Sequence, residues 1–373
     1  MNIPTRISIS AYILCVVAAV LVLSACNKEG DTVYLPDPHE PQPSVAPLVT
    51  VIYDPDALGD RSYNDLLYQG VETAASRHGL RTMQLSPHSY EEGLTYMATM
   101  FEAVRQSAAL QDTVRRLYII AAASYEQLLR ENTHLFADNP YADLLLLETP
   151  TPLEGKGSTL YLPYYGAMYE AGALMPAVSS KAVVIGSNPE DRTVAGAIRG
   201  FCDGFGTDYY DATKQINTFY LAQHAGQGYN LPGTTLLQMS KEAGEKAAEL
   251  LEKAVIVPIC GGTGFAMCYI IELTETNSYL GVDVDVLSTH SSISCVKHID
   301  RAVSQCIDQW LSPEGMPKHQ SLGLSTGYTE VVTHLTDEHL KERFEALISD
   351  DTRQLIHQDA IRKEAEYEQN ATR

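Results

Sequence analysis

The chain has 373 residues and carries 47 acidic side chains against 26 Lys and Arg, a formal net charge of −21. Nucleic acid binding needs clustered basic residues that neutralise phosphates, so this composition argues against DNA or RNA as a partner. It also argues against electrostatic docking on anionic lipid headgroups. Hydrophobic, charged, glycine and proline contents are those of a globular protein, and the length predicts two domains.

Residues 1–25 have the pattern of a bacterial secretory signal. Arg6 precedes an apolar stretch, residues 11–23, that is too short to cross a bilayer as a stable helix. Leu23-Ser-Ala-Cys26 matches the lipobox motif, in which the cysteine thiol receives diacylglycerol and becomes the first residue of the mature chain. Each buried methylene adds about 0.8 kcal/mol of membrane affinity, so the acyl chains can act as the anchor. We therefore expect a lipoprotein attached to a membrane through Cys26.

Residues 26–46 are predicted to be a linker. The segment is polar and contains four prolines, a composition typical of semi-rigid extended spacers. Asn27 does not resemble the aspartate that retains lipoproteins in inner membranes, and the acidic residues around Lys28 resemble export tags for surface display. The sequence therefore favours an outer-membrane location, facing either the periplasm or the outside.

Beyond residue 46, short apolar runs alternate with helical patterns. Each run is rich in β-branched residues or leucine and is followed by a helix-like segment, as buried parallel strands are. The predicted strands are residues 48–53, 82–86, 117–121, 144–147, 182–185, 255–259 and 279–283. This alternation predicts a doubly wound α/β architecture with parallel sheets.

Two such sheets fit the length of the chain. We expect the chain to cross between them near residues 164–166 and to return near residues 288–292. The predicted parts are an N-terminal lobe of residues 47–165 plus 290–334, a C-terminal lobe of residues 166–289, and a C-terminal helical tail of residues 335–373 that packs across the lobes or is solvated.

Motifs of the common enzyme classes are missing from the sequence. There is no Gly-x-Ser-x-Gly elbow and no His-Glu-x-x-His, and the glycine-rich turn at residues 260–264 lacks the Lys-Ser/Thr of a phosphate-binding loop. The five cysteines after Cys26 match no zinc spacing, and their odd number predicts at least one free thiol. We expect neither an enzyme, nor a metal site, nor a cofactor.

Ligands of open parallel sheets bind beyond the carboxyl ends of the strands. This rule selects the loops at residues 54–64, 122–126, 187–192, 261–264 and 283–288. The turn around Gly262 enters a helix, so its backbone amides could face a ligand, although a tight turn with positive φ accounts for its glycines equally well. Asp283 and Asp285 alternate along a strand and should point to opposite faces, so one of them is expected to be structural.

Six sequence blocks resemble those of the basic membrane protein family and occur in the same order. They are Val49–Asp54 with Gly59-Asp-Arg-Ser-Tyr-Asn64 and Gly70–Gly79, Tyr169-Glu-Ala-Gly-Ala-Leu174, Gly200-Phe-Cys-Asp-Gly-Phe205, Cys260-Gly-Gly-Thr-Gly264, Leu280-Gly-Val-Asp-Val-Asp285 and Ser294–Val303. Members of this family are lipoprotein receptors of ABC importers, and several bind purine nucleosides. The resemblance covers most of residues 48–305 and implies a type I periplasmic binding protein fold, with two α/β lobes joined by three crossings.

The resemblance also implies a nucleoside site. Asp54 would hold the base edge, Tyr63 would stack on the base, and Asn64 would form a hydrogen bond beside it. Asp283 and Lys297 would hold the ribose hydroxyls. Stacking on an aromatic ring contributes about 1–3 kcal/mol, and a Lys–Asp pair offers both a donor and an acceptor. Taken without the family, the same residues also fit structural roles: core packing for Tyr63, helix capping for Asp54 and an exposed helical face for Lys297.

Two regions depart from the family pattern. The loop that carries a ligand-contacting acid after the third strand is replaced by residues 121–126, where Glu126 is expected to take the place of that acid. The second stacking aromatic falls in residues 220–231, where Tyr229 and His224 both fit, and we select Tyr229 as the site residue.

The sequence thus predicts a monomeric, lipid-anchored substrate-binding protein that presents a purine nucleoside to an ABC permease in the inner membrane. One alternative keeps the fold and changes the ligand to a sugar or another small signal molecule. A second alternative is a surface or structural lipoprotein whose cleft has decayed.

Overall fold

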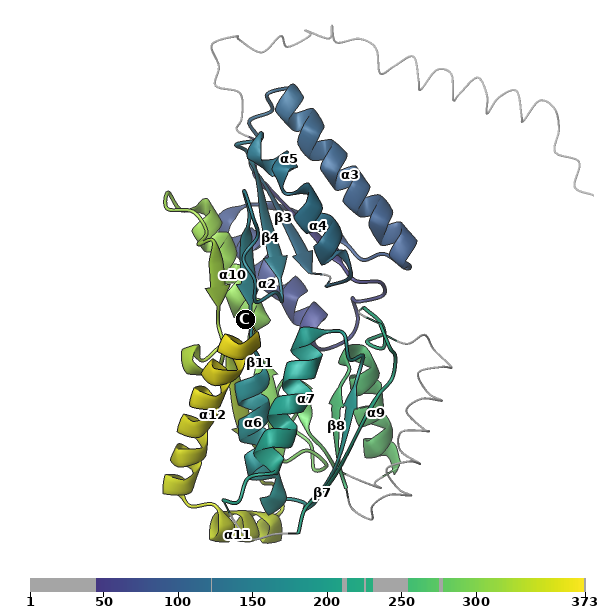
Figure 1. Ribbon diagram of the computed structural model, residues 1–373. Coiled ribbons are helices and arrows are strands. Elements are labelled where there is room, and N and C mark those ends of the chain that lie inside the picture. Colours follow the sequence, from purple (N-terminus) through teal and green to yellow (C-terminus); the bar gives the residue numbers. More distant parts are fainter. Residues whose placement is uncertain are drawn as a thin grey trace, which may run out of the picture. The chain divides into compact units, whose positions relative to one another are not determined.

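The computed structural model describes residues 45–121, 123–209, 213–224, 226–230, 254–274 and 278–371. The predicted signal peptide, Cys26 and nearly all of the linker lie outside the described residues. From residue 46 onward the chain forms one compact unit, which consists of two α/β lobes (Figure 1). Within the described ranges, no helix is both long enough and apolar enough to cross a membrane.

The first lobe is built on a six-stranded sheet with the order β12-β5-β4-β3-β1-β2, in which all neighbours run parallel. The central strands are continuous apolar runs, as expected for a sheet covered on both faces. The strands are β1 (Leu48–Tyr53), β2 (Arg81–Leu85), β3 (Arg116–Ala121), β4 (Ala142–Leu147), β5 (Ser158–Tyr161) and β12 (His319–Ser321).

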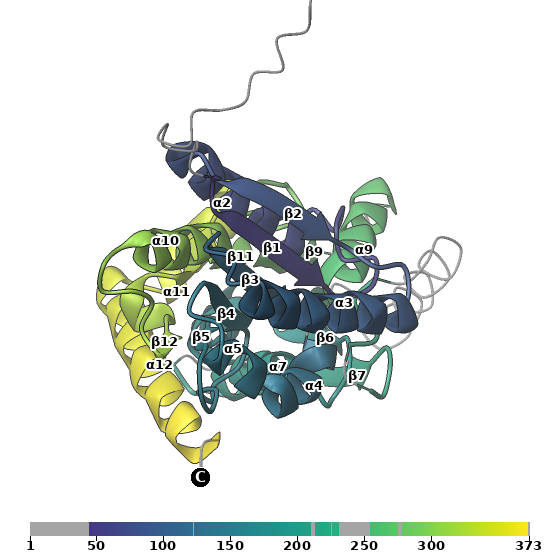
Figure 2. The same ribbon diagram turned by 90° about the horizontal axis from the view of Figure 1, so that it is seen from above.

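Helices cover both faces of this sheet because its side chains alternate. Val49 and Val51 pack against the helices of one face, and Ile52 packs against those of the other. The first face carries α2 (Tyr63–His78) and α10 (Ile299–Leu311). The second carries α3 (Tyr90–Ala109), α4 (Glu126–Asn132) and α5 (His134–Ala137), with the short helix η1 (Ala123–Tyr125) before α4. Figure 2 shows α3 lying across the strands of this sheet.

The second lobe contains two smaller sheets. One is parallel with the order β7-β6-β8-β9, and the other has the order β10-β11-β13, in which β13 runs antiparallel to β11. The strands are β6 (Lys181–Gly186), β7 (Gln215–Tyr220), β8 (Val255–Ile259), β9 (Ser278–Tyr279), β10 (Gly281–Asp283), β11 (Ile293–Lys297) and β13 (Thr329–Thr333).

Helices α6 (Tyr165–Leu174) and α7 (Arg192–Phe205) pack together on one side of the second lobe, and α9 (Gly261–Thr274) covers the other side. The approach of α6 to α7 needs glycine. A Cβ atom at Gly204 would lie 2.0 Å from the carbonyl oxygen of Tyr169. A side chain there would push the two helices apart, which is why a small residue is required on this face of α7.

Three chain segments join the lobes: residues 162–164 between β5 and α6, residue 298 between β11 and α10, and residues 322–323 between β12 and the short helix η3 (Leu324–Thr326). The short helix η2 (Met175–Ala177) follows α6 inside the second lobe. These segments are the places where a hinge motion between the lobes would be absorbed.

The predicted division of the chain differs from the structure after residue 290. Residues 290–334 were expected to belong entirely to the first lobe, whereas only α10 and β12 do so. Strands β11 and β13 pair with β10, and Ile293 and Cys295 of β11 face the core of the second lobe. The return crossing therefore lies after β11 rather than at residues 288–292.

The C-terminal helices also belong to the second lobe. They are α11 (Glu338–Leu347) and α12 (Asp350–Ala371). Phe344, Ile356 and Ala360 are fully or almost fully buried in the core of that lobe. In Figure 1, α12 runs beside α6 and ends at the level where the lobes meet. The predicted tail at residues 335–373 is thus an integral part of the lobe over its described length.

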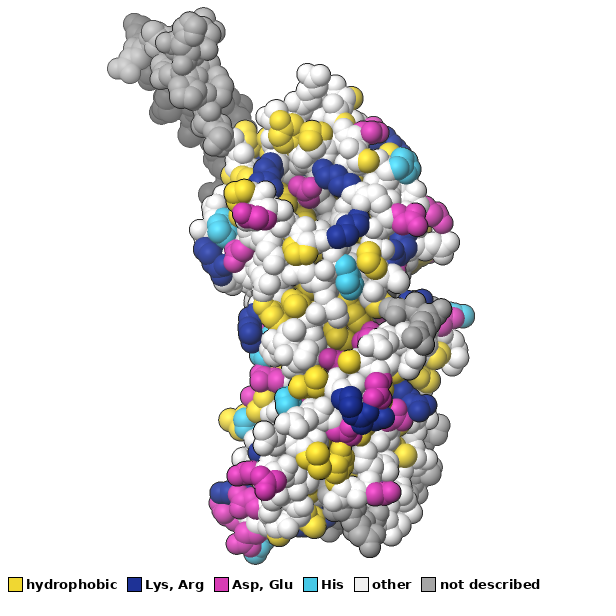
Figure 3. All heavy atoms as spheres, turned by 60° about the vertical axis from the view of Figure 1, so that its left-hand side comes forward, with side chains coloured by type: hydrophobic (Ala, Val, Ile, Leu, Met, Phe, Trp, Pro, Cys, Tyr) yellow, Lys and Arg dark blue, Asp and Glu magenta, His cyan; other side chains and the backbone are white. Residues whose placement is uncertain are grey.

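Charged side chains of both signs are interspersed over the face of the molecule in Figure 3. Acidic side chains gather at the lower left of this view, and the described part of this face has no continuous basic surface. Such a surface is what binding to a nucleic acid backbone requires.

Candidate functional site

A cavity lies between the lobes, at the carboxyl ends of strands from both. It contains about 840 Å³ of empty space, part of which is continuous with solvent. The first lobe contributes residues that follow β1, β3 and β4, and the second contributes residues that follow β8, β10 and β11. Ligand pockets of α/β proteins have this position.

The start of α2 forms one wall of the cavity and is organised by Asp60. This carboxylate is 4% exposed and accepts hydrogen bonds from the backbone amides of Ser62 (2.8 Å), Asn64 (3.0 Å) and Asp65 (3.2 Å). It also accepts one from the Asn64 side-chain amide (2.9 Å). Burial raises the pKa of Asp60, and these hydrogen bonds oppose the shift. Asp60 therefore caps the helix and fixes the position of Tyr63 between its partners.

Asp54 follows β1 and accepts a hydrogen bond from the Ser124 hydroxyl. The loop around Gly226 of the second lobe approaches this carboxylate, since a Cβ atom on Gly226 would lie 3.8 Å from Asp54 Oδ1. Asp54 thus lies where the two lobes come together across the cavity.

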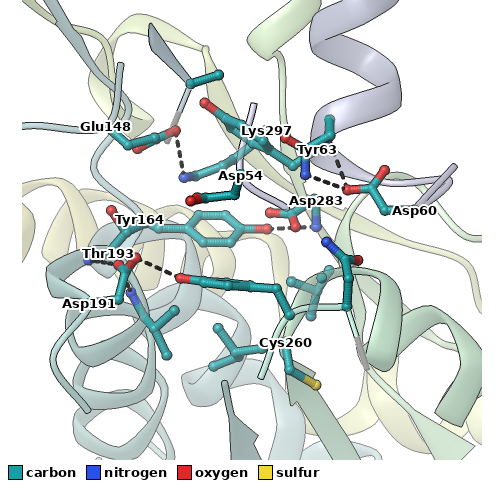
Figure 4. Close-up of a pocket in the computed structure, with 18 of the residues that line it drawn as sticks. Asp54, Asp60, Tyr63, Glu148, Tyr164, Asp191, Thr193, Cys260, Asp283 and Lys297 are labelled. Atoms are coloured by element: carbon teal, nitrogen blue, oxygen red, sulfur yellow. Dashed lines mark hydrogen bonds and ion pairs between the residues drawn. The ribbon is translucent and has the colours of Figure 1, made fainter. Parts of the chain in front are cut away.

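Lys297 ends β11 and is the centre of a buried charge cluster. It is 3% exposed, and its Nζ donates a hydrogen bond to Glu148 Oε1 at 3.1 Å. The same ammonium lies 5.4 Å from the ring centre of Tyr63 and 4.9 Å from that of Tyr164. In Figure 4, Glu148 and Lys297 face each other beside the Tyr164 ring. A carboxylate and two aromatic faces around a cation offset much of the free energy that the cation loses when it leaves water.

Asp283 is the second carboxylate of this cluster. Its pKa is raised to about 6, chiefly by removal from water and in addition by the nearby carboxylates Asp60 and Glu148, while the charge of Lys297 opposes the shift. Its Oδ2 accepts a hydrogen bond from the Ser62 hydroxyl at 3.2 Å. Asp283 therefore changes its charge close to neutral pH.

Two of these carboxylates sit on unusual backbone conformations at the ends of their strands. Glu148 follows β4 with φ of 55°, and Asp283 ends β10 with φ of 67°. Left-handed conformations are rare for residues other than glycine and cluster at functional sites. Tyr164 supports the second of them: its hydroxyl accepts a hydrogen bond from the Asp283 amide (2.9 Å) and donates one to the Cys295 carbonyl (2.6 Å).

Two polar atoms of the cavity are buried without a well-formed hydrogen bond. They are Glu148 Oε2 and the Tyr63 hydroxyl, neither of which has a partner of good geometry among the described residues. Burial, and next the charge of Glu148, raise the pKa of Tyr63 well above its ordinary value. Buried polar groups are nearly always satisfied, so this acceptor and this hydroxyl are suited to bonding a ligand.

Tyr229 forms the wall contributed by the second lobe. Its hydroxyl donates to Asp191 Oδ2 at 2.6 Å, while Asp191 Oδ1 caps α7 by accepting from the amides of Thr193 (2.8 Å) and Val194 (3.2 Å). The Tyr229 carbonyl accepts from the Thr263 amide at 2.8 Å at the start of α9. Two helix starts therefore hold this ring in place.

Most of the residues selected from the sequence line the cavity. They are Asp54, Tyr63, Asn64, Tyr229, Asp283 and Lys297. Of the two candidates for the second aromatic position, Tyr229 lines the cavity, whereas His224 is exposed and pairs with Glu190 at 3.3 Å.

Two selected residues do not line the cavity. Glu126 begins α4 and pairs with Arg130 (2.7 Å) and with the Thr149 hydroxyl (3.0 Å), so its charge is satisfied locally. Gly262 lies against Asn230, because a Cβ atom there would be 2.5 Å from Asn230 Oδ1. Its neighbour Gly261 lines the cavity in its place. Gly262 therefore permits a close approach of two chain segments.

Sequence reasoning missed several lining residues, which are Asp60, Glu148, Tyr164, Asp191 and Cys260. Asp60, Asp191 and Cys260 lie in or beside loops that the strand-end rule had selected. Glu148 directly follows the apolar run at residues 144–147, so the same rule applied to that strand would have found it. Tyr164 lies on the crossing predicted near residues 164–166, and the strand-end rule does not select residues on crossings.

The cavity is strongly acidic. Five carboxylates line it, from Asp54, Asp60, Glu148, Asp191 and Asp283, and Lys297 is the one Lys or Arg among its lining residues. Within the described part of the chain, no group of three or more His, Cys, Asp or Glu side chains is arranged to hold a metal ion. The described cysteines are all free, which gives this region no disulfide. An anionic ligand would be repelled here.

No family model matches the chain, and no curated protein is similar to it in sequence. Solved structures are similar in fold. A solute-binding protein of an ABC transporter system from Aeropyrum pernix K1 has a TM-score of 0.60 at 16% identity, over 87% of this chain and 91% of that one. The chain has the type I periplasmic binding protein fold.

Two further structures show how widely this fold is used. A transcriptional activator of the comK gene from Bacillus halodurans has a TM-score of 0.57 at 13% identity, over 81% of this chain and 95% of that one. A galactofuranose binding protein has a TM-score of 0.51 at 12% identity, over 80% and 97%. The predicted fold class is thereby confirmed, and at these identities the periplasmic binding protein fold alone is shared.

Proposed function

We propose that this chain is the lipid-anchored substrate-binding protein of an ABC-type importer and that it binds a purine nucleoside between its lobes. The observation that supports this most is the combination, in one interlobe cavity, of aromatic rings with the Lys297–Glu148–Asp283 cluster. Aromatic faces suit a flat base, and a lysine between carboxylates suits sugar hydroxyls, which both donate and accept. Side chains suited to holding a small polar molecule between two lobes favour a receptor that closes on its ligand.

The negative charge of the cavity restricts the proposed ligand to molecules without an anionic group. Five carboxylates against one lysine disfavour phosphate and carboxylate groups, because the lysine is already paired with Glu148. A nucleoside is therefore a better candidate than a nucleotide. The two buried polar atoms without a well-formed hydrogen bond, Glu148 Oε2 and the Tyr63 hydroxyl, are the first candidates for direct ligand contacts.

Isothermal calorimetry on the chain from residue 40 onward tests this proposal. Inosine, guanosine and adenosine are compared with their 5′-monophosphates and with ribose, galactose and glucose. We expect micromolar or tighter binding of at least one nucleoside and none of its monophosphate. Tyr63→Leu should weaken that binding at least tenfold, which is about 1.4 kcal/mol. Tyr68→Leu is the matched control, since Tyr68 lies on the same helix, is 40% exposed and does not line the cavity.

A free sugar is the second candidate ligand. Carboxylates that accept hydrogen bonds from hydroxyls are common in sugar sites, and one of the similar structures is a galactofuranose binding protein. Binding of a sugar together with no response to any nucleoside would favour this candidate. A failure of all these compounds would point to the structural lipoprotein with a decayed cleft.

The anchor and the location need separate experiments. We propose that Cys26 carries the lipid and that the protein is attached to an outer membrane. It faces either the cell exterior or the periplasm. Labelling with an alkyne fatty acid should mark the full chain and not its Cys26→Ser variant. Protease treatment of intact cells should release the domain if it is on the surface and leave it intact if it faces the periplasm. We further propose a monomer whose partner is an inner-membrane ABC permease.

A further inference from the structure

Helix α12 is anchored in the second lobe by buried side chains. Ile356 and Ala360 have no exposed surface. About two turns further, the Tyr367 ring stacks on Tyr165 of α6, with ring centres 4.4 Å apart and an angle of 15° between the planes. This packing fixes the C-terminal half of α12 against the first turn of α6, where the chain has just crossed from the first lobe.

Glu364 of α12 is buried at the hinge, with 6% of its surface exposed. Its Oε2 accepts a hydrogen bond from the Gly166 amide at 2.8 Å, and its Oε1 accepts one from the Leu324 amide at 3.0 Å. Gly166 lies two residues after the crossing at residues 162–164, and Leu324 directly follows the crossing at residues 322–323. One carboxyl group therefore joins two of the three crossings.

The chain provides space for this carboxyl group through two glycines. A Cβ atom on Gly166 would lie 2.6 Å from Glu364 Oε2, and one on Gly323 would lie 2.3 Å from Oε1. Neither glycine has a positive φ, so space rather than backbone conformation requires glycine at both positions. Both chain segments that bond to Glu364 thus have a glycine where its carboxyl group needs space.

The same end of α12 also contacts the first lobe and the wall of the cavity. Glu368 Oε1 accepts a hydrogen bond at 3.1 Å from the hydroxyl of Tyr161, which ends β5. Tyr164 lies between Tyr161 and Gly166 on the first crossing, and it lines the cavity and bonds to the Asp283 amide. A shift of this crossing would therefore move a wall of the ligand site.

We propose that α12 is a brace for the hinge and that Glu364 is a positioning residue for closure of the lobes on their ligand. By holding the first and third crossings together, it limits how far the lobes open in the free protein. Hinge segments absorb the φ and ψ changes of closure, and a protein that is less often in its binding-competent arrangement binds more weakly in proportion. The part of this inference that concerns affinity rests on the proposed function.

The test compares Glu364→Gln with Glu366→Gln, a variant on the same helix whose side chain is 48% exposed. Glutamine keeps the volume of Glu364 and loses one of its two acceptors. We expect three effects of Glu364→Gln alone: faster hydrogen exchange at the amides of Gly166 and Leu324, a larger radius of gyration in small-angle scattering of the ligand-free protein, and about tenfold weaker binding of inosine in calorimetry at 25 °C.

Tyr161→Phe provides an independent check if Glu364→Gln fails to fold. It removes only the hydroxyl that bonds to Glu368. We expect the same faster hydrogen exchange and larger radius of gyration, and about threefold weaker binding of inosine. A purely structural role would lower the melting temperature of these variants while leaving the radius of gyration and inosine affinity as in the parent, and that result would overturn the brace. If the parent binds no nucleoside, the proposed function fails, and scattering and hydrogen exchange still decide whether Glu364 limits opening.

Discussion

At the scale of single residues, the cavity depends on how Lys297 is neutralised. Its ammonium is buried between Glu148, Asp283 and two tyrosine rings. Burying one charge alone is costly, whereas a charge that is paired and hydrogen-bonded is tolerated. Lys297 therefore offsets the cost of burying the two carboxylates, and the carboxylates offset the cost of burying Lys297.

Lys297→Met should therefore be strongly destabilising. It leaves the carboxylates of Glu148 and Asp283 buried without their cation, and we expect a loss of about 3–5 kcal/mol in unfolding free energy at pH 8. Urea denaturation followed by circular dichroism measures this loss. Lys363→Met is the control, since Lys363 is 36% exposed on α12 and should change stability by less than about 0.5 kcal/mol. Equal effects of the two substitutions would show that Lys297 is not the counterion of the cluster.

Asp283 makes a prediction about pH. Its pKa is raised to about 6, chiefly by burial, so it loses its charge in the folded protein as pH falls through 6. If the ionised form accepts hydrogen bonds from the ligand, affinity should be constant above pH 7 and fall up to tenfold per pH unit below 6. Calorimetry between pH 5 and 8 measures this, and Asp283→Asn should bind weakly at every pH. A flat profile in the parent protein would remove Asp283 from the ligand contacts.

The same shift affects stability with the opposite sign. Because the pKa of Asp283 is higher in the folded chain than its ordinary 3.8, the folded state holds the proton more tightly. This stabilisation is complete below pH 3.8 and is lost as pH rises through 6. Binding and stability therefore respond to pH in opposite directions at this residue.

At the scale of elements, the start of α2 links helix capping to the site. Asp60 accepts hydrogen bonds from three backbone amides at the start of the helix, those of Ser62, Asn64 and Asp65. Asp60→Ala should cost about 0.5–2 kcal/mol of stability and also weaken ligand binding, because Tyr63 and Asn64 lie in the turn that it organises. Asp337→Ala removes a comparable cap, which accepts the Leu340 amide at 2.8 Å at the start of α11, away from the cavity. It should lower stability similarly and leave affinity unchanged.

The buried Glu364 of helix α12 leads to a prediction about how stability depends on pH. Burial raises the pKa of Glu364 to about 7, and hydrogen bonds from the amides of Gly166 and Leu324 oppose the shift. The folded chain therefore favours the protonated acid, whose stabilisation is present below pH 4.5 and is lost as pH rises through 7. From Glu364 we expect at most about 3 kcal/mol less unfolding free energy at pH 8 than at pH 4.5. Urea titrations at several pH values between 4.5 and 8 should show a smaller decline in unfolding free energy for Glu364→Gln than for the parent protein.

At the scale of the whole molecule, a ligand in the cavity should act on both lobes. The cavity is lined from β1 and β4 on one side and from β8 and β11 on the other. A ligand at 100 times its dissociation constant stabilises the folded state by about 2.7 kcal/mol. Hydrogen exchange with and without inosine should therefore slow near Asp54 and also near Cys260. Protection confined to one lobe would contradict binding between the lobes.

Much of the fold could be predicted because buried strands are local features. Six of the seven predicted strands are single strands in the structure, with ends that differ by a few residues, since continuous apolar runs mark strands covered on both faces. The seventh, residues 279–283, is divided into β9 and β10, which belong to different sheets. The strands that were missed are short or polar, such as β12 (His319–Ser321), and exist because a neighbouring strand offers its edge. The placement of β11 in the second lobe depends on pairing with β10 and β13, which no local pattern reports.

The site could be predicted where a side chain follows a strand, and it could not be predicted elsewhere. Strand ends meet at one edge of a sheet, so Asp54 and Asp283 were found from position alone or with the family pattern. Tyr164 and Glu364 act through contacts with segments far away in the chain, Tyr164 with Cys295 and Glu364 with Gly166. Such partners follow from how the lobes are joined.

The sequence by itself determined the class of the fold and the acidic character of the molecule, because composition, periodicity and strand ends are local properties of the chain. Six residues that line the cavity were selected through the resemblance to a family. Only the tertiary structure decided that Lys297 is buried against Glu148, that Glu126 lies outside the cavity and that the C-terminal helix reaches the hinge. These depend on distances between residues up to 198 positions apart, which packing of the two lobes establishes.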